Sequence, residues 1–230
     1  MEFLAKQLSD QEAYKLLIGC VVPRPIAWVS TISNKGVANI APFSFFTVVC
    51  TSPPKLGITI IPDKNNNRDK KDTLLNIEET KNFVVNIADL SLAEQLVQTS
   101  YPYQYGVDEF AQCGLTSKPS IDIASPCIKE APINMECRLS EVLKLGYDGS
   151  YFVIGEVVRF HIQDEFLVEE RKVDQQKLQA FGRMGGPLYT KAIDLFSMKV
   201  SVPQNSKINE SFISETKEEN NDRKDTGKTF

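Results

Sequence analysis

The chain has 230 residues, of which 42% are hydrophobic, so it can bury one substantial core. Its net charge is −4, its pI is about 5.2 and it contains no basic block, which disfavours binding to nucleic-acid phosphates. The longest apolar runs are too short to span a bilayer, and the N-terminus lacks a basic region followed by an apolar core. These features predict a cytoplasmic protein with no nucleic-acid or membrane partner.

The N-terminal part predicts one short helix followed by strands. Ser9 and Glu12 have the spacing of a capping box, which predicts a helix with Ala13, Leu16 and Leu17 on one face. Pro23 and Pro25 fix φ and donate no ladder hydrogen bond, so they suit the start or edge of a strand. β-Branched and aromatic residues between Gly, Pro and Asn breaks predict strands at about 26–32, 37–41, 46–51 and 56–61. Gly36 suits the tip of the first hairpin because glycine tolerates positive φ.

The middle of the chain alternates between helix and strand patterns. After a polar, loop-like segment at 63–69, a helix is expected from Asp72 or Thr73 to near Asn82, burying Leu74, Leu75 and Ile77. A strand is expected at 83–88. Ser91 and Glu94 have the spacing of a second capping box, ahead of a helix that ends near Thr99.

The clearest strand pattern lies further on. Ile133, Met135, Cys137 and Leu139 alternate with Asn134, Glu136, Arg138 and Ser140, which predicts a half-buried antiparallel strand. Another long strand is expected at 151–162, after a turn at 146–149. Strands dominate, and no G-x-G-x-x-G motif follows a strand, so an antiparallel barrel is favoured over a doubly wound sheet.

The end of the chain differs in composition. Residues 203–230 are rich in polar and charged residues and contain few apolar anchors. Such a segment cannot bury enough surface to offset its conformational entropy. We therefore expect one domain at residues 1–202 and a disordered tail at 203–230.

The cysteines and the single histidine offer little sign of a metal or redox site. The five cysteines contain no Cys-x-x-Cys pair, and zinc fingers and redox dithiols need closer spacing. Buried, reduced thiols are the favoured interpretation. His161 lies in a strand pattern and is expected to be structural. No metal ligand is predicted.

An ordered set of motifs resembles the flavin reductase-like family of FMN-binding split barrels. The first motif is PRPIAWVSTISNKGVANIAPFSFF at residues 23–46. Further likeness lies in Ser52–Pro54, Lys71–Leu74 with Asn76 and Ile77, Phe83–Asn86, and Gly182–Gly186 with Tyr189. The resemblance implies a mainly β fold with peripheral helices, an antiparallel split β-barrel, and a homodimer whose partner chain completes each flavin pocket.

The resemblance places the FMN phosphate near Lys71, Asp72 and Thr73. A helix start supplies free backbone N–H groups and the positive end of the dipole beside a lysine and a hydroxyl. Arg68 adds a second cation that can fork onto a phosphate. Taken alone, these residues favour a plainer interpretation, in which Asp72 caps the helix and Lys71 is solvated.

The resemblance places the flavin ring and ribityl chain along the first two strands. Polar residues interrupt these strands, although a buried polar group without a partner is unfavourable. These residues either satisfy each other and the backbone or bind the ligand. The expected cofactor-binding residues here are Ser30, Thr31, Asn39, Ile40, Ala41, Pro42, Ser44 and Phe45. Trp28 stands where many relatives have a smaller residue, so the pocket floor is expected to differ.

Two further segments have alternative interpretations. Arg183, in the glycine-rich segment at 181–186, either faces the phosphate or an anionic substrate, or is a surface charge on an ordinary turn. Tyr101, Tyr103 and Tyr105 either cover a flavin face or pack against a partner subunit, and the second is favoured.

The resemblance implies an FMN-dependent oxidoreductase of the flavin reductase type. FMN would accept hydride from NAD(P)H and pass electrons to a flavin or another acceptor, with no side chain acting as a catalytic acid or nucleophile. The alternative is a flavoredoxin-like electron carrier without its own NAD(P)H turnover. A third possibility is a structural β-barrel without a ligand.

Overall fold

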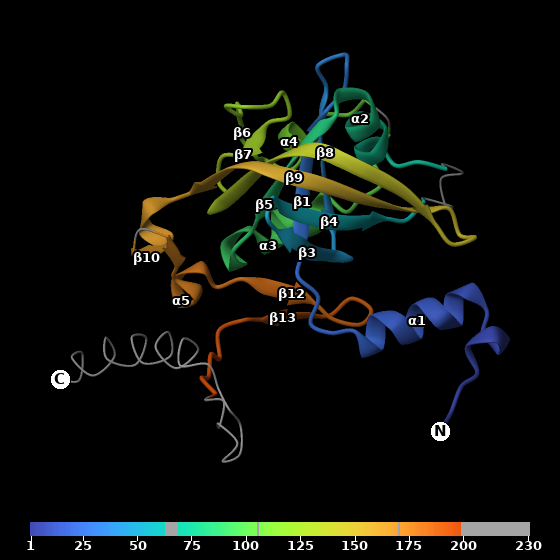
Figure 1. Cartoon of the computed structure of the whole chain (residues 1–230). Helices are drawn as coiled ribbons and strands as arrows, with labels where there is room; N and C mark the ends of the chain where they lie inside the picture. The colour runs from blue at the N-terminus through green and yellow to red at the C-terminus, as the bar shows by residue number, and fades with distance from the viewer. Residues whose placement is uncertain (63–68, 105, 170, 199–230) are drawn as a thin grey trace, which may run out of the picture. The chain divides into compact units, whose positions relative to one another are not determined.

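The computed structural model describes residues 1–62, 69–104, 106–169 and 171–198 (Figure 1). Met1–Leu195 form one compact unit that contains all the helices and strands below. The helical elements are η1 Ala5–Gln7, α1 Asp10–Cys20, α2 Asp72–Thr80, η3 Leu90–Leu92, α3 Ala93–Gln98, α4 Glu109–Gln112, η4 Asp164–Phe166 and α5 Gln175–Leu178. The predicted tail at 203–230 lies outside the described residues, so the boundary at 202 stays a prediction.

A seven-stranded antiparallel sheet in the order β2-β1-β5-β8-β9-β4-β3 dominates this unit (Figure 1). Its strands are β1 Ala27–Ile32, β2 Ala38–Phe43, β3 Phe46–Thr51, β4 Pro54–Ile60, β5 Asn82–Ile87, β8 Ile133–Leu145 and β9 Ser150–Ile162. Three small hairpins accompany it, formed by β6 Ser117–Lys118 with β7 Cys127–Ile128, β10 Leu167–Glu169 with β11 Lys172–Val173, and β12 Phe181–Arg183 with β13 Tyr189–Lys191. The predicted strands are confirmed, with ends shifted by a few residues.

The first hairpin follows from its sequence. Gly36 has φ of 79° at the tip, and the Ser33 N–H donates to the Val37 carbonyl at 2.9 Å. β2 lies at one end of the sheet order, so one of its edges has no neighbouring strand. Pro42 is accepted there because a proline on an outer strand removes no ladder bond from the sheet interior.

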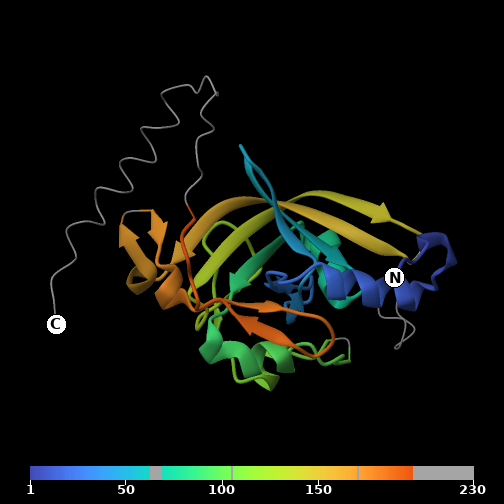
Figure 2. The ribbon, with the colours of Figure 1, turned by 90° about the horizontal axis from the view of Figure 1, so that it is seen from below.

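The main core lies on one face of the strongly twisted sheet. It is built from apolar side chains of β1, β2, β4, β5, β8 and β9, and Leu74 and Ile77 of α2 complete it. A second core on the opposite face joins Trp28 and Ile40 to residues of η3, α3 and α4. Figure 2 shows α3 and α4 beneath the strands in that view. Helices therefore cover parts of both faces, and Leu75 of α2 is only partly buried.

The prediction that β8 is half-buried is wrong for its first half. Asn134 is 4% exposed and Glu136 is fully buried, although both were predicted to face solvent. The segment from β6 to β7 covers this face, since Asn134 Nδ2 donates to the Ile128 carbonyl at 3.0 Å and the Ile121 N–H donates to Glu136 at 2.8 Å. Irregular segments carry no periodicity, so the sequence pattern did not indicate this cover.

The two predicted capping boxes have different outcomes. At α1, the Ser9 side chain accepts from the Glu12 N–H and Glu12 accepts from the Ser9 N–H, which confirms the first box. The second is wrong, because Asp89 caps the η3 turn by accepting from the Ser91 N–H at 3.0 Å. α3 starts one turn later without a side-chain cap.

α1 buries none of its residues within this chain, although its N-terminus is well capped. Leu17 is 58% exposed and Tyr14 is 48% exposed. None of the helices in the described ranges is long and apolar enough to cross a membrane.

All five cysteines are free. Cys113, Cys127 and Cys137 are buried as predicted, whereas Cys50 is partly buried and Cys20 is exposed at the end of α1. The expectation of buried thiols is therefore wrong for Cys20, since α1 stands outside the core.

Candidate functional site

Two sequence stretches that are far apart in the chain meet at one cavity of about 300 Å³. Asn39 of β2 and Thr73 of α2 join the stretches, because Asn39 Nδ2 donates to Thr73 Oγ1 at 3.1 Å. The lining residues are Asn39, Ala41, Pro42, Lys71, Asp72, Thr73, Thr99, Ser100, Tyr101, Pro102, Tyr103 and Glu109. A polar helix start, an outer strand and an aromatic loop therefore enclose a single space.

The start of α2 is suited to an anion. Lys71 is the N-cap residue with extended backbone, and its side chain makes no cap hydrogen bond. The first amides of a helix have no intrahelical acceptor, so a helix start of this kind favours negative charge. Asp72 is the first helical residue, so the interpretation in which it caps the helix is wrong. The Lys71 Nζ lies 5.9 Å from the centre of the Phe43 ring, beside the cavity.

A second cavity of about 200 Å³ shares Pro42 and Ser100 with the first. Its wall includes Ser44 and Arg183, two predicted site residues, together with Tyr14, Ile18, Arg24, Ile26, Leu96, Gly186 and Tyr189. The Arg183 guanidinium stacks on the Tyr189 ring at 4.4 Å and donates to the Gly186 carbonyl at 2.6 Å. Arg183 therefore lies on a cavity wall, held by its own hairpin.

Arg24 ties the walls of the second cavity together. Its guanidinium donates to the carbonyls of Ile18, Val21 and Met184 at 2.7, 2.9 and 3.0 Å, and its Nε lies 3.4 Å from Ser44 Oγ. Burial lowers the pKa of this guanidinium. Arg24 thus links the end of α1, the β12–β13 hairpin and the bend at residues 44–45 between β2 and β3. The sequence did not predict this role.

Several predicted site residues do not line either cavity. Ser30 is fully buried and donates to the Pro126 carbonyl at 2.5 Å, and Thr31 is fully buried and accepts from Asn76 at 3.0 Å. Ile40 belongs to the second core. Phe45 lies near Arg24, 5.8 Å from the ring centre to the guanidinium carbon. Ser30 and Thr31 therefore bond to the protein's own backbone and side chains, which is the first of the two alternatives for these polar residues. Arg68 lies outside the described residues.

Thr99 and Ser100 line the first cavity, although no sequence pattern predicted them as site residues. Thr99 and Ser100 follow α3, and Thr99 Oγ1 accepts from the Trp28 indole N–H at 2.8 Å. Trp28 is therefore held behind the cavity wall. Tyr101 and Tyr103, which the sequence singled out as covering either a flavin face or a partner subunit, also line the cavity, with ring centres 5.0 Å apart. Tyr105 lies outside the described residues.

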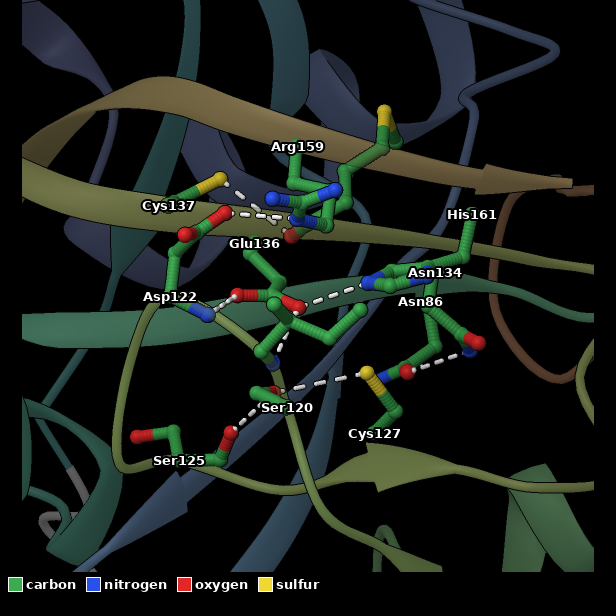
Figure 3. Close-up of polar contacts among 12 residues, drawn as sticks. Asn86, Ser120, Asp122, Ser125, Cys127, Asn134, Glu136, Cys137, Arg159 and His161 are labelled. Atoms are coloured by element: carbon green, nitrogen blue, oxygen red, sulfur yellow. Dashed lines mark hydrogen bonds and ion pairs between the residues drawn. The ribbon is translucent and has the colours of Figure 1, made fainter.

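A separate polar cluster surrounds Glu136, and Figure 3 shows its contacts. Ligand-type atoms of Cys127, Glu136 and His161 lie within 4.8 Å of one another. The His161 Nε2 to Glu136 Oε1 distance is 2.6 Å, which is a hydrogen bond, and the same carboxylate accepts the N–H groups of Ile121 and Asp122. We interpret the cluster as a structural anchor for the segment between β6 and β7.

The family model described as the flavin reductase-like domain matches residues 18–177. The chain belongs to the flavin reductase-like family. The match contains β1 to β9 and the first cavity, and ends before the β12–β13 hairpin that carries Arg183.

The match to this chain covers almost the whole length of three similar proteins. An uncharacterised protein from Aquifex aeolicus is 41% identical over 203 residues, which cover 87% of this chain and all of the relative. The crystal structure of nitrilotriacetate monooxygenase component B from Bacillus cereus has a TM-score of 0.81 at 31% identity, covering 86% of this chain and 98% of that chain. A protein with a split barrel domain from Shewanella frigidimarina has a TM-score of 0.75 at 24% identity, covering 87% and 100%.

The fold of this flavin reductase-like chain is therefore mainly β, with few helices, in the split-barrel arrangement. The residues at the first cavity fit a phosphorylated group, since they combine a lysine, a hydroxyl and the start of a helix. The second cavity adds tyrosine and aliphatic walls next to it. Together the two cavities suit a ligand with an anionic end and an extended aromatic part.

Proposed function

We propose that the chain is an FMN-dependent oxidoreductase of the flavin reductase type, which passes hydride from NAD(P)H to a flavin or another acceptor. The observation that carries the proposal is that Asn39, Ala41 and Pro42 line the same cavity as Lys71–Thr73. Two cavities that share Pro42 and Ser100 give room for a ligand longer than either.

The side chains would bind and orient the cofactor. Lys71, the Thr73 hydroxyl and the first amides of α2 would hold its phosphate. Tyr101, Tyr103 and the walls around Ser44 would border its ring system. Bound FMN would supply the hydride-accepting chemistry, which no side chain at the site provides.

We further propose that the protein works as a homodimer. α1 has no fully buried residue within its own chain and exposes Tyr14 and Leu17, and Val48 of the terminal strand β3 is 64% exposed. Exposed apolar side chains of this kind favour association. Tyr14 also lines the second cavity, so a partner chain covering α1 would lie next to the ligand. Light scattering coupled to gel filtration should give twice the chain mass.

The binding proposal is tested by titrating the purified protein with FMN and following the quenching of flavin fluorescence. The double variant Lys71→Ala/Thr73→Ala should weaken FMN binding by at least about tenfold, because it removes a cation and a hydroxyl from the phosphate. The matched control is Thr116→Ala/Lys118→Ala, which removes the same residue types from an exposed segment. Unchanged FMN affinity in the first variant would contradict the phosphate assignment.

The reaction is tested by adding NADH or NADPH together with excess FMN. Steady oxidation of the nicotinamide supports a flavin reductase. Bound FMN that neither nicotinamide reduces would instead support the electron carrier. A protein that binds no FMN would leave only a structural role for the barrel.

A further inference from the structure

Glu109 places a carboxyl group on the wall of the first cavity. It is the first residue of α4 and is only 7% exposed. Its Oε2 accepts the N–H of Ile40 at 2.5 Å, on the side of β2 where the sheet has no further strand. Asp108 fixes the start of α4 by accepting from the N–H groups of Phe110 and Ala111. The carboxyl group is therefore held in place from two sides.

The charges around Glu109 do not favour its ionised form. Lys71 is the cation among the described residues that line this cavity, and Asp72 lies on the same wall. The other ionisable neighbours are Asp108, Tyr103 and Cys113. Burial raises the pKa of Glu109 to about 8; the Ile40 N–H opposes this shift and the negative charges of Asp72 and Asp108 add to it. Glu109 is therefore mostly a neutral acid at pH 7.

An ionised Glu109 would conflict with the ligand proposed above. A phosphate monoester is close to a dianion at pH 7, since its second pKa is about 6. With Asp72 and an ionised Glu109 both on the wall, an incoming phosphate dianion would meet two carboxylates in the same cavity. A neutral Glu109 removes one of these repulsions and offers an O–H that can donate to an oxygen of the ligand.

We propose that Glu109 must carry a proton for the cavity to accept the phosphate of its ligand, so that the pH controls binding through this one side chain. The inference rests on the proposed function in one respect, namely that the phosphate belongs to FMN. It assigns Glu109 a role in specificity for the charge of the ligand, and it involves no proton transfer to the ring.

The expected size of the effect follows from proton linkage. If only the neutral form binds, the apparent dissociation constant rises in proportion to one plus the ratio of ionised to neutral Glu109. With a pKa of about 8 this factor is about 1.1 at pH 7 and about 11 at pH 9. FMN affinity should therefore fall about tenfold between pH 7 and pH 9.

The experiment measures the dissociation constants of FMN and riboflavin from about pH 6.5 to about pH 9, which brackets the expected midpoint. Riboflavin shares the ring and lacks the phosphate, so its affinity should change little. In Glu109→Gln, whose amide oxygen still accepts from Ile40, the pH dependence of FMN binding should disappear. Glu94→Gln, a change at an exposed carboxylate, should keep the wild-type profile.

Infrared difference spectroscopy on the ligand-free protein gives a second readout. The carbonyl stretch of a carboxylic acid should be lost as the pH is raised through about 8, and Glu109→Gln should lack this change. This readout keeps the test decisive on the wild type if the variant fails to fold.

The outcomes separate the two proposals. FMN binding with the same affinity at pH 7 and pH 9, or an equal fall for riboflavin, would overturn the role of Glu109 and leave the FMN site standing. An unaltered pH profile in Glu109→Gln would do the same. No FMN binding at any pH would overturn both the proposed function and this inference.

Discussion

Replacing Glu136 with glutamine should destabilise the protein by about 3 kcal/mol. The carboxylate is fully buried and accepts three hydrogen bonds, from Ile121, Asp122 and His161, at 2.8, 2.7 and 2.6 Å (Figure 3). An amide has one acceptor oxygen, so at least one backbone N–H in the segment between β6 and β7 would face an NH₂ group. Each lost hydrogen bond to a charged group contributes about 1.5–3 kcal/mol.

Thermal denaturation followed by circular dichroism is the assay. For a unit of this size, about 3 kcal/mol corresponds to a fall in Tm of about 6–12 °C. The control is Glu130→Gln, because Glu130 also accepts a backbone N–H, from Thr116 at 3.1 Å, but is exposed. Its Tm should change by less than about 2 °C, as expected for an exposed hydrogen bond worth well under 1 kcal/mol. A Glu136→Gln variant as stable as Glu130→Gln would refute the reasoning.

The same comparison has a definite pH dependence. Burial alone would raise the pKa of Glu136, but the N–H groups of Ile121 and Asp122 and the His161 ring outweigh it and hold the pKa below its ordinary value of 4.5. A lowered folded-state pKa means that the stabilisation is complete above the ordinary value and is lost as the pH falls through the folded one. The Tm difference between wild type and Glu136→Gln should therefore shrink as the pH is lowered from 7 to about 3.

Two further substitutions test the packing. Gly155→Ala should destabilise the protein by about 1–3 kcal/mol, because a Cβ there would lie 2.7 Å from Cε1 of the buried Phe83 ring. The control Gly19→Ala should not destabilise the protein, because nothing lies within 4 Å of a Cβ at that position. Equal chemical denaturation midpoints for the two variants would count against the predicted clash. Trp28→Phe should lower the free energy of unfolding by about 1–3 kcal/mol, through the lost hydrogen bond to Thr99 and the smaller ring. An unchanged urea midpoint for Trp28→Phe would show that the indole N–H contributes nothing.

Local signals predicted much of the fold. The Ser9–Glu12 capping box and the hairpin tip at Gly36 depend on neighbours within a few residues, and both formed as expected. Asn39 and Lys71–Thr73 were correctly expected to meet, but the family resemblance, rather than any local pattern, brought those stretches together.

The remaining features depend on contacts between distant segments. Ser91 does not cap a helix as predicted, because Asp89, two residues earlier, caps the short turn that contains Ser91. Glu136 was expected to face solvent because its strand alternates, and an irregular segment covers it. Glu109 had no distinctive pattern, since an acidic residue at the start of a short helix is ordinary. Its burial becomes visible only when α4 packs on β2.

The contact between Glu109 and β2 also occupies part of the outer edge of the sheet. β2 is the last strand on its side of the sheet, and an unpaired outer strand is a template for another chain. The Ile40 N–H is already taken by Glu109, and Pro42 has no N–H to offer. The contact between Glu109 and Ile40 thus forms part of the pocket wall and also occupies the outer edge of β2. Redesigning the pocket here for a new ligand would leave that edge open to pairing with a strand of another chain.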